Sequence, residues 1–62
     1  MLKISLKAAR VNAEIKQQEA ASLLGVTPAT LRNWESKKSY PNGEQIERIC
    51  QLYGIKYDHI IF

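Results

Sequence analysis

The chain has one cysteine and one histidine among its 62 residues, and this scarcity excludes two common ways of stabilising a small domain. A single cysteine, Cys50, cannot form a disulfide within the chain. Cys50 and His59 together also fall short of the four ligands of a structural zinc site. A chain of about 60 residues buries only about 60% of its unfolded surface. Stability must therefore come from close packing of its elements, within one chain or between two.

Long apolar runs are also absent. No stretch approaches the ~20 apolar residues that span a membrane. The N-terminal segment MLKISLKAAR lacks the continuous apolar core of a signal peptide. A lone cysteine is typical of proteins in a reducing compartment. We therefore expect a cytoplasmic protein that has no membrane partner.

The side-chain groupings that carry out catalysis are missing as well. The sequence contains no evident nucleophile–base pair, no pair of carboxylates in a catalytic pattern and no set of metal ligands. We therefore expect a protein that is not an enzyme. We also expect it to bind no metal, no cofactor and no small-molecule substrate.

What the sequence does contain is apolar residues at helical spacing, without the sustained alternation of strands. We predict one all-α domain over residues 1–62, with five helices at residues 2–13, 17–24, 28–35 or 28–36, 43–53 and 57–61. The expected apolar stripe of the first helix is Leu2, Leu6, Ala9 and Ala13. The expected buried face of the fourth helix is Ile46, Ile49, Cys50 and Tyr53.

Several helix ends carry clear signals. Gly25 is expected to end the second helix, because glycine adopts the left-handed conformation without steric cost. Thr27 is a good N-cap, and Pro28 suits the first position of the third helix, where its missing N–H costs nothing. Asn42 with Gln45 three residues later matches a capping box at the start of the fourth helix.

Only residues 25–27 separate the second and third predicted helices. So short a turn, with glycine at its head, makes two helices cross steeply, as they do in helix-turn-helix pairs. The small Ala21 lies one turn before Gly25, where a larger side chain would block the crossing. The spacing therefore predicts a helix-turn-helix over residues 17–35.

The third predicted helix has two unlike faces. Leu31 and Trp34 lie on one side of the helical wheel, and Ala29, Arg32 and Asn33 lie on the other. In a major groove, arginine reads guanine, asparagine reads adenine, and alanine contacts the thymine methyl group. The polar face therefore suits DNA readout, although an ordinary amphipathic surface helix would show the same pattern.

Charge is distributed unevenly along the chain. Residues 1–40 carry seven basic and three acidic side chains, a net charge of +4, whereas residues 41–62 carry two basic and three acidic ones, a net charge of −1. This asymmetry indicates a polyanionic partner for the first part of the chain.

The segment QQEAASLLGVTPATLRNWES, residues 17–36, resembles the helix-turn-helix of the phage repressor and Cro family, the lambda-repressor-like DNA-binding domains. Gln17, Ala21 and Gly25 match the family's pattern at the start of the first helix, the crossing and the turn. The apolar matches are Ala20, Leu24, Val26, Leu31 and Trp34. The segment PNGEQIERICQLYGIKYDHII, residues 41–61, is similar to the last two helices of the family.

The resemblance implies a compact five-helix, repressor-like domain that binds double-stranded DNA and regulates transcription in a phage or bacterium. The residues it implies to face bases are Thr27, Pro28, Ala29, Arg32 and Asn33. Those it implies to contact phosphates are Lys16, Gln17, Ser36, Lys37, Lys38 and Tyr40. Arg10 and Glu35 match an arginine and its acidic partner, and we interpret them as a structural ion pair, with a phosphate contact by Arg10 as the alternative.

The chain departs from the family's pattern at three positions. Pro28 replaces a long polar side chain, so direct readout there is lost. Glu14 replaces the usual glycine after the first helix, which puts the geometry of that turn in question. Lys16 replaces a serine or threonine cap, and either Glu19 compensates through the helix dipole or Lys16 reaches a phosphate.

The resemblance also implies a homodimer on a pseudo-palindromic operator. The candidates for the dimer contact are Leu52, Ile60 and Phe62, which lie off the buried stripe or at the apolar end of the chain. The alternative is that they complete the core of the monomer, and a dimer contact is favoured for Leu52 and Phe62. An alternative of another class is a protein-interaction module, or an antitoxin, that uses the same fold. Arg32, Asn33 and the two lysines that follow argue for DNA.

Overall fold

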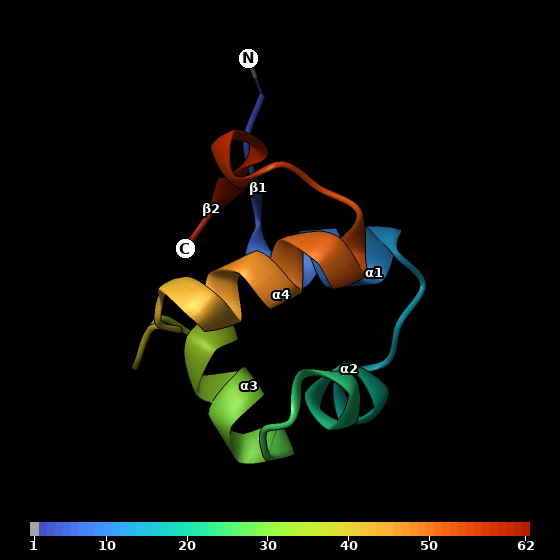
Figure 1. Ribbon diagram of the computed structural model, residues 1–62, viewed down its shortest axis with the longest axis vertical. Coiled ribbons are helices and arrows are strands. Elements are labelled where there is room, and N and C mark those ends of the chain that lie inside the picture. Colours follow the sequence, from blue (N-terminus) through green and yellow to red (C-terminus); the bar gives the residue numbers. More distant parts are fainter. Residues whose placement is uncertain (1) are drawn as a thin grey trace.

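The computed structural model describes residues 2–62 as four α-helices, one turn of 3-10 helix and a small sheet (Figure 1). The helices are α1 (Leu6–Asn12), α2 (Gln17–Leu24), α3 (Pro28–Glu35), α4 (Gly43–Tyr53) and the 3-10 turn η1 (Tyr57–His59). The strands β1 (Ile4–Ser5) and β2 (Ile60–Ile61) pair in parallel, with Ile4 opposite Ile60. The domain is therefore mostly helical, but the prediction of five helices is wrong.

The first helix begins four residues later than predicted. Ser5 is extended, and its hydroxyl accepts a hydrogen bond of 3.1 Å from the backbone N–H of Ala8, which makes it the N-cap of α1. Ile4 and Ser5 then pair with the far end of the chain as β1. Leu2 consequently lies outside the helix and is exposed, so its predicted place on the apolar stripe is wrong.

The helix predicted over residues 57–61 is shorter in the structure. Only Tyr57–His59 form a helical turn, and the next two residues become β2. Ile60 is 4% exposed and belongs to the core, so of the two alternatives for this residue the structure shows the core of the monomer and not a dimer contact. Its side chain packs in the core cluster, and its backbone pairs with β1.

The core is built from all four helices and β2. Its members are Leu6, Ala9, Ala20, Ala21, Leu24, Leu31, Trp34, Ile49, Tyr53 and Ile60. Ala20 and Ala21 have no exposed surface, and their small side chains let α2 lie close to its neighbours. Because Leu31 and Trp34 belong to this core, α3 is held by its apolar face.

The longest helix, α4, begins and ends where the capping signals predict. The Asn42 side chain accepts from the backbone of Gln45 at 2.9 Å, the Gln45 side chain accepts from the backbone of Asn42 at 2.8 Å, and Gly54 ends the helix at φ 66°. Of the residues predicted to be buried, Ile49 and Tyr53 are in the core, but Ile46 and Cys50 are only half-buried.

None of the helices formed by residues 2–62 has the length and apolar character needed to cross a membrane.

Candidate nucleic-acid interface

Helices α2 and α3 are joined by the three-residue turn expected from the sequence, and Figure 1 shows them crossing steeply. Gly25 closes α2 in the left-handed conformation at φ 73°. The backbone N–H of Val26 donates to the carbonyl of Ala21 at 2.9 Å. The Thr27 hydroxyl then accepts from the backbone of Thr30 at 3.2 Å, so α3 starts at Pro28. Local hydrogen bonds therefore set the orientation of α3 against α2.

The two faces of α3 are separated as the helical wheel predicts. Leu31 is 0% exposed and Trp34 is buried. The residues predicted to face bases are all exposed: Thr27, Pro28, Ala29, Arg32 and Asn33. The guanidinium of Arg32 and the amide of Asn33 are thus accessible on a helix whose other side is anchored. Recognition of bases by these residues stays a prediction.

The residues that follow α3 remain beside it. Lys37 adopts a left-handed conformation at φ 65°, and the backbone N–H of Lys38 donates to the carbonyl of Asn33 at 2.9 Å. The chain therefore turns back onto the end of α3. The side chains of this segment that were predicted to contact phosphates are exposed: Ser36, Lys37, Lys38 and Tyr40.

The start of α2 presents backbone donors. Lys16 is the N-cap, but its side chain makes no capping hydrogen bond. The first helical hydrogen bond runs from the N–H of Ala20 to the carbonyl of Lys16, at 2.8 Å. The N–H groups of the first turn precede that bond, and a helix start of this kind attracts anions. Lys16 itself is exposed, in agreement with a role at the surface.

Arg10 and Glu35 form an ion pair between α1 and α3. Arg10 Nε lies 2.7 Å from Glu35 Oε2, and the two side chains are 10% and 6% exposed. A second guanidinium nitrogen donates to Glu35 Oε1 at 3.4 Å, and the third donates to the carbonyl of Ile15 at 3.0 Å. All three nitrogens of Arg10 are therefore engaged inside the domain, and this arrangement agrees with the structural interpretation of the pair.

Gln17 joins the same network. Its side-chain amide nitrogen donates to Glu35 Oε1 at 3.1 Å, so the first residue of α2 is tied to the last residue of α3. Tyr53 lies nearby. Burial, together with the negative charge of Glu35, raises the pKa of Tyr53 to about 12, and the positive charge of Arg10 acts in the opposite direction. The tyrosine is therefore neutral at physiological pH.

A shallow polar hollow lies above this network. Its lining residues are Lys7, Arg10, Gln17, Arg32, Glu35 and Ser36. It brings together three residues predicted to contact DNA, Gln17, Arg32 and Ser36, and adds Lys7, which the sequence analysis did not assign to the site. Lys7 lies three residues before Arg10, and residues at that spacing share one face of a helix.

Glu14, at the position where the family usually has glycine, adopts the backbone conformation that a glycine would adopt in this turn. Glu14 has φ 59°, a left-handed conformation that costs a side chain some energy. Its backbone N–H donates to the carbonyl of Val11 at 2.9 Å. The turn between α1 and α2 is thus formed despite the replacement of glycine.

The remaining dimer candidates are partly used by the monomer. Leu52 is half-buried and packs against the core. Phe62 is also half-buried, and its ring stacks on Tyr57 with 5.9 Å between the ring centroids. Both retain some accessible surface, and their contact with a second chain stays a prediction.

Comparison with known proteins agrees with this arrangement. A family model described as helix-turn-helix matches residues 6–60, from the start of α1 to β2. No curated protein and no solved structure matches the chain. The family match covers most of the chain and includes α2, the turn and α3. The chain belongs to the Cro/lambda-repressor-like helix-turn-helix family, whose members are typically DNA-binding regulators.

Proposed function

We propose that this protein is a repressor-like transcriptional regulator that binds specific sequences of double-stranded DNA, with α3 in the major groove. The observation that carries the proposal is the accessible face of α3, where Arg32 and Asn33 lie opposite the buried Leu31 and Trp34. A helix held in this way can enter the groove without losing its contacts to the core. Ala29, Arg32 and Asn33 then read base edges.

The surroundings of α3 supply the contacts to phosphates. Lys37 and Lys38 follow its end, and Lys16 and Gln17 lie at the start of α2. Phosphate contacts position a protein on DNA, and base contacts determine which sequence it prefers. The two groups of residues therefore have separable effects on binding.

Affinity for duplex DNA should fall steeply with salt concentration. Each neutralised phosphate contributes about −0.9 to the slope of log affinity against log salt, so five or so contacts per half-site give a slope of about −4.5 for each half-site. The measurement is a fluorescence-anisotropy titration of an operator-containing duplex at several salt concentrations. If no binding to any duplex, including pools of random sequence, is detected at low salt, the DNA proposal fails.

Arg32→Ala and Lys38→Ala should weaken binding in different ways. Loss of Arg32 should cost about 1–3 kcal/mol at one base position and relax the preference there, because a bidentate contact to guanine is lost. Loss of Lys38 should weaken binding to all sequences alike and make the salt slope less steep by about 1. Binding-site selection on random duplexes, run on both variants, compares them. An equal, sequence-independent loss in both would contradict the proposed role of Arg32.

We further propose that two copies bind a pseudo-palindrome, with the α3 helices about 34 Å apart in successive major grooves. One helix-turn-helix contacts only one half-site, and its affinity is limited by that small area. Pairing of two copies makes binding of the second half-site effectively intramolecular. Binding to a full operator should therefore exceed binding to a half operator.

A second candidate function is binding of a partner protein, alone or together with DNA as in an antitoxin. The observation that favours it is Pro28, which is exposed at the start of α3 and offers no side-chain hydrogen bond for base readout. The salt titration distinguishes the two, because a protein-interaction module that does not bind DNA has no affinity for duplexes even at low salt.

A further inference from the structure

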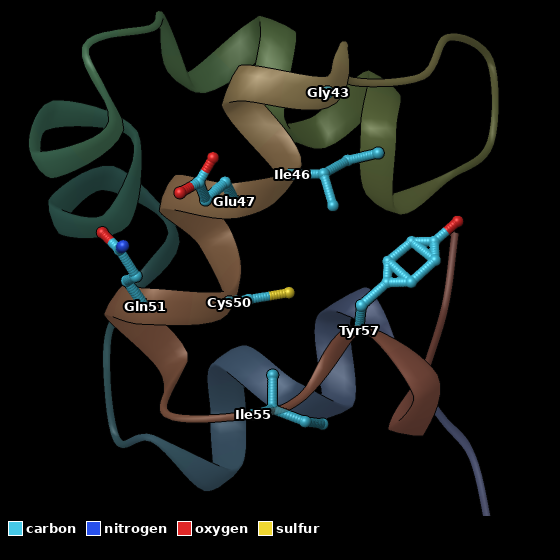
Figure 2. A pocket seen from close by; sticks show the side chains of 7 residues that line it. All are labelled: Gly43, Ile46, Glu47, Cys50, Gln51, Ile55 and Tyr57. Atoms are coloured by element: carbon cyan, nitrogen blue, oxygen red, sulfur yellow. The ribbon is translucent and has the colours of Figure 1, made fainter.

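The polar hollow above Arg10 and Glu35 differs in charge from a second hollow, which lies beside α4. The hollow beside α4 has a volume of about 390 Å³ and is lined mainly by uncharged side chains, among them Ile46 and Tyr57 (Figure 2). Its charged lining residue, Glu47, is acidic. The polar hollow is similar in volume, about 360 Å³, but several of its lining residues are cations. Of the two, the polar hollow is therefore the one whose charge attracts an anion.

Two exposed cations line the polar hollow. Lys7 comes from α1 and Arg32 from α3, and both side chains are exposed. The ion pairs formed within residues 2–62 involve other arginines, so neither of these two charges is neutralised by an acidic side chain. A concave surface that carries charges of one sign concentrates ions of the opposite sign. The lysine and the arginine therefore act together on an anion that enters the hollow.

The carboxylate in the hollow does not cancel this attraction. The Glu35 side chain is only 6% exposed, and its Oε2 accepts from Arg10 Nε at 2.7 Å. Its Oε1 accepts from a second nitrogen of Arg10 at 3.4 Å and from the Gln17 amide at 3.1 Å. Both oxygens are thus engaged, and the negative charge is balanced by a buried positive one. The three cations and one carboxylate that line the hollow leave a net charge of +2.

The buried ion pair also determines where Lys7 lies. Lys7 and Arg10 are three residues apart in α1, so they share one face of the helix. Because Arg10 is bound to Glu35, the last residue of α3, this face of α1 is held beside the end of α3. The same hollow contains three residues to which the proposed function assigns contacts with DNA: Gln17, Arg32 and Ser36. Lys7 is therefore continuous with the proposed DNA-binding face.

We propose that Lys7 contacts a backbone phosphate that lies in the polar hollow, so that α1 joins α2 and α3 at the DNA. The proposal rests on the proposed function and adds to it a residue from a third helix. The ammonium group of lysine binds phosphate as a point charge with three donors, on a flexible stem that adjusts to the position of the strand. Because its partner is the backbone, Lys7 contributes to affinity and register and not to the choice of sequence.

Lys7→Ala should weaken binding to a duplex with one half-site by about tenfold, the effect of losing one charge-assisted contact. Binding to a duplex of unrelated sequence should weaken equally. The slope of log affinity against log salt should become less steep by about 1. Fluorescence-anisotropy titrations at several salt concentrations measure both effects. The matched control is Lys56→Ala, which removes the same charge from an exposed residue outside the hollow and should leave the salt slope unchanged.

Uncharged methylphosphonates, placed one at a time in the DNA backbone, test whether the contact is direct. The natural chain should bind about tenfold more weakly when the phosphate in the polar hollow is replaced. Lys7→Ala should be insensitive to replacement of that one phosphate and remain sensitive to the others, because two changes that remove the same contact are not additive. Lys38→Ala should lose its sensitivity at a different phosphate.

Two further variants separate charge from folding. Lys7→Arg keeps the charge and should keep the salt slope, whereas Lys7→Gln removes the charge from a long side chain and should behave as Lys7→Ala. Lys7 is exposed and forms no ion pair within residues 2–62, so its replacements should leave the melting temperature unchanged. The loss of affinity is then an effect on the contact with DNA and not on the folded fraction.

Two results would overturn Lys7 as a phosphate contact. One is a Lys7→Ala protein with the salt slope of the natural chain. The other is a Lys7→Ala protein that binds more weakly but stays sensitive to the same set of methylphosphonates, since its charge would then act on the DNA from a distance. In both cases the natural chain still binds duplexes, so only the role of Lys7 is wrong. If the natural chain binds no duplex at low salt, the proposed function itself fails.

Discussion

Glu35→Ala should lower the free energy of unfolding by about 3–5 kcal/mol, because removal of one partner of a buried ion pair leaves the other charge buried and unpaired. Arg10 is 9% exposed and would lose both of its hydrogen bonds to Glu35. Gln17 would lose its partner as well. A domain of this length has a total stability of about 3–9 kcal/mol, so the loss would be a large part of it.

Urea denaturation of Glu35→Ala measures this loss, with Glu44→Ala as the matched control. Glu44 also forms an ion pair with an arginine, at 2.9 Å, but its side chain is 74% exposed. An exposed pair of this spacing contributes only about 0.3–0.5 kcal/mol. A Glu35→Ala protein as stable as the natural one would mean that Arg10 does not depend on Glu35 and is available to a phosphate.

Leu31→Ala should lower the free energy of unfolding by about 2–5 kcal/mol, through lost burial and the cavity left behind. Leu31 is 0% exposed and belongs to the core through which α3 is held. Because each kcal/mol shifts the melting temperature of a domain this small by about 4–8 °C, calorimetry resolves the effect easily. DNA binding should decline only in proportion to the fraction of protein that is folded. The preference among DNA sequences should stay the same.

The control for Leu31→Ala is Leu23→Ala, on the neighbouring helix. Leu23 is 61% exposed, so the same truncation should change stability by no more than about 0.5 kcal/mol. If Leu31→Ala kept its stability while the preference for one operator sequence changed, Leu31 would have to face the DNA, and the assignment of the two faces of α3 would be wrong.

The helices whose ends depend on local chemistry were predicted from the sequence with their bounds. Thr27 with Pro28 starts α3, the reciprocal hydrogen bonds of Asn42 and Gln45 start α4, and Gly25 ends α2. Each signal acts within one helical turn, so no knowledge of the rest of the chain is needed. The same holds for the two faces of α3, which follow from helical periodicity alone.

The features that were missed depend on contacts between distant parts of the chain. Strands of two residues are too short to show alternation, and β1 forms because its partner arrives from the other end of the sequence. The start of α1 at Leu6 is also marked locally by the Ser5 cap, a signal that the sequence analysis did not use. Periodicity also assigned Ile46 and Cys50 to the core, because it identifies an apolar face but does not say what covers that face.

The division of α3 into an anchored side and a free side has a consequence for how such a domain changes over time. Leu31 and Trp34 hold the helix, while Ala29, Arg32 and Asn33 are exposed and lie outside the core. Substitution of surface residues of this kind usually alters stability very little. Selection can therefore act on the exposed three with little interference from folding, so that duplicated copies of the domain can diverge toward new targets while keeping one architecture.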